Sequence, residues 1–280
     1  MTNTDKLIKE LKSKPASEII SGIYKYQDEH NRWFLNSRGG FVSYFEPSYD
    51  FYVSLVSSLN YVDKKGWGWS KNLPFIYLGN STYPLFKAYT LSLEGFYDES
   101  LILSREALEL LIKSIFCICY RKDCFATYSK PEKGKRAFNL TNFLDDDLKI
   151  KSDFLYRLPS AGSHGQLYIT RILHALKQGK KHDKIGLTLK LDTQMVSASI
   201  NYLTFLIWAH IYLLTVVFNE LAPGKEINNK VRKDAQFYIK TLGHIVKSTP
   251  KGFSKIGEDF EKIIKIVEVA IEGKDWKKFT

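Results

Sequence analysis

Residues 195–218 carry no charged side chain over a run of 24 residues. A helix of this length measures about 36 Å, so it is long enough to cross a bilayer. A helix buried on most sides within a bundle explains the run equally well, because the run also contains six polar residues. These residues are Ser197, Ser199, Asn201, Thr204, His210 and Thr215. We expect the buried helix, with His210 hydrogen-bonded in the core, and keep a membrane-associated effector as the alternative.

The remaining pattern predicts an all-α fold, an up-and-down helical bundle. Apolar residues recur at helical spacing in residues 4–29, in a region over residues 85–120 that forms either two helices or one helix bent at Gly95, and in residues 228–247 and 255–272. In the second of these regions Asp98 is the expected cap. The expected core positions that follow it are Leu101, Leu108, Leu111, Ile112 and Ile115. Two further helices are predicted, over residues 144–158 and 166–176, and the first should end before Pro159.

Residues 31–84 have a different character, because glycine and proline interrupt short aromatic runs and only residues 51–62 predict a helix. We expect an irregular aromatic elaboration here. Its aromatic side chains either pack against the core, which we favour, or stack on nucleobases. They are Trp33, Phe34, Trp67, Trp69, Phe75 and Tyr77. The predicted domains are residues 1–84 (N-terminal helix and elaboration), 85–222 (bundle core) and 223–280 (C-terminal helical pair packed on the core or facing a partner).

The charge of the chain is unevenly distributed. The formal net charge is +11, and residues 151–250 hold 14 Lys and Arg against 6 Asp and Glu, whereas residues 1–100 hold 11 of each sign. This excess indicates either RNA or another polyanion as a partner, or a generic basic surface. Three cysteines, Cys117, Cys119 and Cys124, cannot form a closed disulfide set, and no secretory signal is recognised. We therefore expect a cytoplasmic protein with buried, unpaired cysteines.

The motifs of common cofactor enzymes are missing from the sequence. It has no phosphate-binding glycine loop, no dinucleotide glycine fingerprint and no His-Glu-x-x-His pair. Three adjacent aspartates, Asp145, Asp146 and Asp147, point in different directions on a helix and favour its positive N-terminal end over a metal. We expect neither a metal nor another cofactor.

The segment Tyr156-Arg157-Leu158-Pro159-Ser160-Ala161-Gly162-Ser163-His164 carries the candidate chemistry. Arginine holds a phosphate with a planar fork of donors, and histidine moves protons near neutral pH. Arg157 and His164 can therefore cleave a phosphodiester without metal. The alternative is structural, in which Arg157 caps a helix end and His164 is hydrogen-bonded beside a glycine turn.

Residues 85–220 resemble HEPN-like helical proteins of bacterial defence, abortive-infection and toxin systems. The resemblance lies in a helix with Ser104-Arg105-Glu106-Ala107-Leu108-Glu109 that precedes the Tyr156-Arg157…His164 element. It implies a metal-independent ribonuclease or RNA-binding effector, and a two-fold homodimer that pairs two copies of Arg157 and His164 in one groove.

In this family reading, His164 and Arg157 are catalytic. Supporting positions would be Arg105, Glu106, Glu109, Tyr156 and Ser160, and RNA would contact Arg171, Lys177, Lys180, Lys181 and Lys184. Glu109 has a second interpretation, an ion pair with Lys113 one turn further along the helix. The alternative function is a non-catalytic helical adaptor that binds a partner protein through the basic surface.

Overall fold

Helices make up nearly all of the chain that the structure, a computed structural model, describes, and this part contains no strand. The described residues are 16–58, 69–120, 140–152, 155–156, 193–221, 229–249 and 251–279. The long helices are α2 (Ala16–Ser58), α3 (Trp69–Asn80), α4 (Thr82–Leu93), α5 (Tyr97–Cys119), α10 (Thr193–Leu221), α11 (Asn229–Lys247) and α12 (Lys251–Ile271). Three short helices are α7 (Leu140–Asn142), η2 (Phe143–Asp147) and η3 (Trp276–Phe279). The predicted all-α bundle is confirmed.

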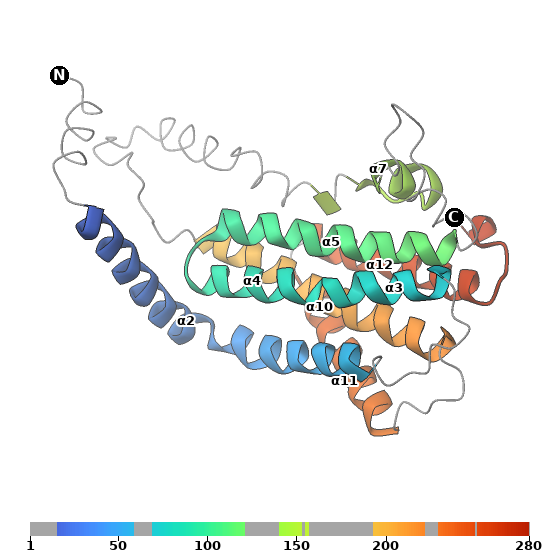
Figure 1. The fold of residues 1–280 in the computed structure, drawn as a ribbon, viewed down its shortest axis with the longest axis horizontal. Helices are drawn as coiled ribbons and strands as arrows, with labels where there is room; N and C mark the ends of the chain where they lie inside the picture. Colours follow the sequence, from blue (N-terminus) through green and yellow to red (C-terminus); the bar gives the residue numbers. More distant parts are fainter. Residues whose placement is uncertain are drawn as a thin grey trace, which may run out of the picture.

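Helices α3 and α4 follow one another along a common line and run back along α5, with α10 and α12 beside them (Figure 1). Of the two arrangements expected at Gly95, the structure has two helices, α4 and α5, joined by a turn, and the Gly95 φ of +87° is an angle that glycine adopts without strain. Phe96 is the N-cap of α5, so Asp98 lies inside the first turn instead of capping it. All five predicted core positions of α5 are buried.

Helix α10 lies at the centre of the core. Its stretch Val196–Phe218 is long and apolar enough to cross a membrane, and 83% of the most apolar part is buried inside the protein. The arrangement is compatible with a core helix of a soluble protein. His210 is fully buried, with Nδ1 2.7 Å from the carbonyl oxygen of Leu206, as expected for a core histidine.

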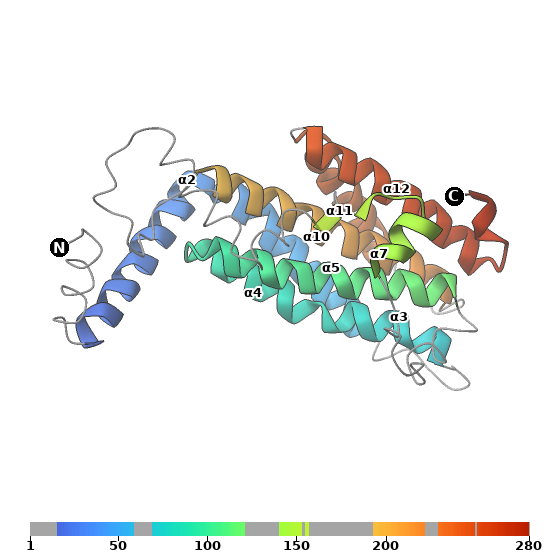
Figure 2. The ribbon, with the colours of Figure 1, turned by 90° about the horizontal axis from the view of Figure 1, so that it is seen from above.

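The irregular elaboration expected from residue 31 onward is wrong for residues 31–58, which belong to helix α2. The helix continues to Ser58 through Pro47, with one non-helical residue, Arg38, ahead of Gly39 and Gly40. Its N-terminal part projects away from the bundle beyond this kink (Figure 2). The glycine pair marks a kink between two helical parts, whereas Pro47 lies inside the second part, so the glycines indicated a real interruption and the proline was misleading.

The aromatic side chains of this region pack into the core, as favoured. Phe34 and Phe75 are buried, and Trp33 and Tyr77 are partly buried against the same core. The side chains of Trp67 and Trp69 lie outside the described residues. One hydrophobic core contains residues from all three segments that the sequence separates, including Phe34, Leu108 and Ile264.

The helix predicted over residues 144–158 is not continuous. A π-turn, η2, ends at Asp147, Lys149 has a φ of +56°, and short helical pieces return at Ser152 and at Leu155. Both the amide nitrogen and the hydroxyl of Ser152 donate to the Asp145 carboxylate, at 2.7 and 2.8 Å. This acceptor satisfies the backbone where the helix stops, and it engages one of the three adjacent aspartates.

Helices α11 and α12 form the predicted C-terminal pair and pack on α10. Trp208 of α10 donates its indole N–H to the carbonyl oxygen of Ile239 at 3.0 Å, and Gly243 lets α11 approach that ring closely. The apolar side of α11 is buried at Ala235, Leu242 and Val246. The opposite side of α11 is therefore fixed in orientation and faces solvent.

Candidate functional site

The predicted supporting residues Arg105, Glu109 and Tyr156 lie together on the surface of the bundle. Nε of Arg105 is 3.0 Å from a carboxylate oxygen of Glu109 one turn along α5, and the Arg105 guanidinium lies 5.7 Å from the centre of the Tyr156 ring. The two charged side chains are 34% and 29% exposed, so water partly screens their attraction. Glu109 therefore pairs with Arg105, which lies one turn before it, and not with Lys113, which lies one turn after it.

Tyr156 is the most buried member of this cluster. Burial raises the pKa of its phenol, and the carboxylate of Glu109 raises it further. Within the described part of the chain its hydroxyl has no hydrogen-bond partner. The neighbouring Tyr202 of α10 donates to the carbonyl oxygen of Leu155 at 2.8 Å and so ties the chain beside Tyr156 to the core. Arg105 is thus held in one position by a carboxylate and an aromatic ring.

The remaining predicted positions divide into two groups. Glu106 is exposed on α5. The other predicted site residues lie outside the described residues, so the predictions made for them stand as made: Arg157, Ser160 and His164, and the RNA contacts Arg171, Lys177, Lys180, Lys181 and Lys184.

Metal ligands were not expected. Among the residues that the structure describes, no three His, Cys, Asp or Glu side chains gather closely enough to hold an ion. Cys117 is buried and Cys119 is partly buried, whereas Cys124 falls outside the described ranges.

A second charged surface, which the sequence predictions did not include, lies on α11. Lys233, Phe237, Lys240 and His244 are all exposed and follow one another at intervals of four, three and four residues. This spacing places them on one stripe of the helix. The segment Asn229–Lys247 contains five Lys and Arg and one Asp.

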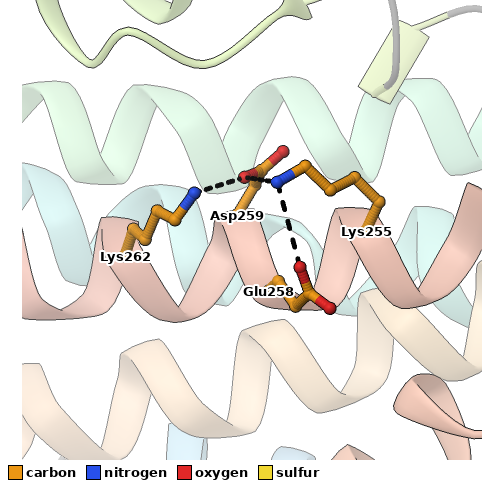
Figure 3. A network of polar contacts seen from close by, with 4 residues as sticks. All are labelled: Lys255, Glu258, Asp259 and Lys262. Atoms are coloured by element: carbon orange, nitrogen blue, oxygen red, sulfur yellow. Dashed lines mark hydrogen bonds and ion pairs between the residues drawn. The ribbon is translucent and has the colours of Figure 1, made fainter.

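On the adjacent helix α12, two lysines are held in ion pairs with acidic residues of the same helix. Asp259 accepts ion pairs from Lys255 at 3.1 Å and from Lys262 at 3.0 Å, and Lys255 also lies 3.8 Å from Glu258 (Figure 3). Lys251–Ile271 contains four Lys and four Asp and Glu. The two helices of the pair thus differ sharply in surface charge.

A sequence signal for the α11 surface was present. In residues 229–247 the basic residues recur at helical intervals on the side opposite the buried Ala235, Leu242 and Val246. The charge excess of residues 151–250 combines the basic residues of 229–247 with those of 177–184. The helical spacing of the basic residues in 229–247 distinguishes the first group from the second.

Comparisons with known proteins find no significant match to this chain, whether to a family model, to a curated protein or to a solved structure.

Proposed function

We propose that the chain is a HEPN-like, metal-independent endoribonuclease or RNA-binding effector that acts as a homodimer in anti-phage defence or a toxin system. The observation that carries the proposal is the position of Tyr156 against Arg105 and Glu109. Arg157 is the next residue in the chain, so the segment with the candidate catalytic pair begins at a half-buried charged cluster on α5. Excess positive charge in residues 151–250 supports a polyanionic substrate.

The proposed chemistry uses only side chains of the protein. His164 takes the proton from the ribose 2′-hydroxyl as that oxygen attacks phosphorus, or gives a proton to the leaving oxygen. Arg157 compensates the negative charge that develops on the phosphoryl oxygens. In the homodimer, each groove receives Arg157 and His164 from both copies.

Glu109 and Arg105 act as positioning residues in this proposal. The ion pair holds the guanidinium over Tyr156, and Tyr156 is covalently joined to Arg157. Losing the pair would change the setting of Arg157 without removing any reacting group. Glu106 is exposed on the same helix and is free to contact RNA or the second copy.

The test is cleavage of total RNA in the presence of a metal chelator. The wild type should cut, and both His164→Ala and Arg157→Ala should lose at least about 100-fold in rate, the usual contribution of general acid–base catalysis. His174→Ala, a histidine outside the motif, is the matched control and should cut normally. Equal rates for wild type and His164→Ala would exclude the proposed enzyme.

A second candidate function is a non-catalytic adaptor. It is favoured by exposed apolar side chains on the projecting part of α2, where Ile20, Ile23 and Tyr24 are 51%, 38% and 67% exposed. Residues spaced by three and four positions share a helix face, which suits a protein partner. This function predicts no RNA cleavage and a stable hetero-complex in a pulldown that Ile20→Asp and Tyr24→Asp abolish.

A further inference from the structure

The exposed stripe of α11 combines cations with one large aromatic side chain. Lys233 and Lys240 lie seven residues apart, about 10 Å along the helix axis, and Phe237 lies between them. Arg232 is exposed beside Lys233, and His244 continues the stripe in the last turn. Successive phosphates of a stacked strand are about 3.4 Å apart along its axis, so the stripe matches roughly four nucleotides.

The cations of this stripe lack the counter-charges that α12 provides for its own. Lys233, Lys240 and Arg232 form no ion pair within the described part of the chain, whereas Lys255 and Lys262 of α12 share Asp259 (Figure 3). Lys247 is the exception on α11, with Nζ 2.5 Å from Glu261. Unpaired cations on a fixed helix release counterions when they meet phosphates, which favours binding.

Phe237 is a large apolar side chain that does not pack into the core and is exposed instead. It is 62% exposed, and its ring meets the edge of Tyr238 at 5.5 Å. Tyr238 in turn stacks on Phe51 of α2 at 4.9 Å. Phe237 thus presents an exposed ring beside Tyr238, and an exposed aromatic ring is what a nucleobase stacks on.

The composition of the stripe distinguishes among anionic partners. An anionic membrane needs an apolar face to insert, but the apolar side of α11 is buried at Ala235, Leu242 and Val246 and only Phe237 is presented outward. An acidic peptide would use the cations and leave Phe237 unused. Single-stranded nucleic acid uses both, because each nucleotide brings a phosphate and a base.

We propose that the exposed face of α11 binds single-stranded RNA, with backbone phosphates on Arg232, Lys233 and Lys240 and a base stacked on Phe237. RNA as the ligand rests on the proposed function. The site is separate in sequence from the Arg157 and His164 segment. In this proposal α11 holds the RNA and the Arg157 and His164 segment cleaves it.

The test measures binding of fluorescein-labelled oligouridylate and oligoadenylate by anisotropy, over a series of salt concentrations, with the full chain in chelator. Lys233→Gln/Lys240→Gln should weaken binding at least 10-fold and reduce the slope of log K against log salt by about 1.4. Lys262→Gln/Lys265→Gln removes the same charge from α12 and should bind like the wild type. All variants are compared by circular dichroism to establish that they are folded.

The aromatic contact has its own matched pair. Phe237→Ala should weaken binding by about 5- to 100-fold, the usual loss of one stacked base, with an unchanged salt slope. Tyr83→Ala removes a similarly exposed aromatic, 65% exposed on α4, and should have no effect. Equal affinity of the α11 and α12 lysine variants would overturn the inference. So would competition by polyglutamate or by phosphatidylglycerol vesicles as strong as that by RNA.

Failure of the inference and failure of the proposed enzyme give different results. If RNA binds through α11 and His164→Ala cleaves like the wild type, the α11 site stands and the enzyme is excluded. If cleavage depends on His164 while the α11 variants bind and cleave normally, the α11 site is excluded and the enzyme stands.

Discussion

The hydroxyl of Tyr97 lies 2.5 Å from Nε2 of His30, and Nδ1 of the same ring lies 2.7 Å from the carbonyl oxygen of Leu93. Because a carbonyl oxygen only accepts, Nδ1 carries the proton and Nε2 accepts from Tyr97. One neutral imidazole thus joins α2 to the end of α4 and the start of α5. Gln27 adds a second link at 3.1 Å to Glu94.

A side chain at Gly95 should destabilise the turn beside this imidazole. An added Cβ would lie 2.7 Å from the Tyr26 hydroxyl and 2.9 Å from Cδ2 of His30, and the positive φ adds backbone strain. Gly95→Ala should lower the free energy of unfolding by about 2–4 kcal/mol in urea. Gly273→Ala has a similar φ, +77°, with open space around it, and should cost only about 1 kcal/mol. Equal losses in the two variants would show that Tyr26 and His30 of α2 do not lie close to Gly95.

Acid should destabilise the protein through His210. Burial lowers the pKa of this imidazole to about 4, although the carbonyls of Leu206 and Ala107 oppose the shift. The unfolded chain binds a proton below its pKa of about 6.5 while the folded chain does not, so stability falls as the pH drops from there toward 4. Between pH 7 and pH 5 this histidine should account for a loss of about 2 kcal/mol.

His210→Gln is the variant that checks this prediction, with urea unfolding at both pH values. The variant should lose about 2 kcal/mol less than the wild type on acidification. Burial also lowers the pKa of His30, so some acid sensitivity should persist. An unchanged acid response would show that His210 titrates normally.

The kink in α2 should respond to helix propensity. Gly40 lies just after the non-helical Arg38, and an added Cβ there meets nothing within 4 Å. Gly40→Ala should therefore raise the free energy of unfolding by about 0.5–1 kcal/mol. A loss of stability instead would show that the backbone at Gly40 is not helical.

The phenol hydroxyl of Tyr156 should contribute nothing to folding. It is buried without a hydrogen-bond partner in the described part of the chain, so Tyr156→Phe removes a desolvated polar atom and keeps the ring under Arg105. Stability should stay equal or rise by up to about 1 kcal/mol. The control is Tyr97→Phe, which leaves Nε2 of His30 without its donor and should cost about 1–3 kcal/mol. Comparable losses of stability in both variants would show that the Tyr156 hydroxyl does form a hydrogen bond.

Periodicity was sufficient to predict α5, α11 and α12, because each buries a regular apolar face. The run of uncharged residues was sufficient to predict α10, which is buried on most sides. Periodicity failed for α2, where Gly39 and Gly40 mark only a kink and Pro47 does not end the helix, because Phe41 and Phe45 pack in the core. It also failed after Asp147, since the capping of Ser152 by Asp145 depends on a local turn that periodicity does not encode.

Parts of the site were predictable to different degrees. A helical pairing of Glu109 was foreseen, but with the wrong partner, because both Arg105 and Lys113 lie four residues away and only tertiary contacts choose between them. The α11 stripe was missed, since its significance depends on which face α10 covers.

The most direct test of the proposed function compares two labelled RNA oligonucleotides in chelator, one all-ribose and one with a single 2′-deoxy substitution at the mapped cleavage site. We expect the wild type to cut the all-ribose strand, to leave the substituted linkage intact, and to lose cleavage on His164→Ala. Cutting of the 2′-deoxy linkage at the same rate, or full activity of His164→Ala, would contradict the proposed function.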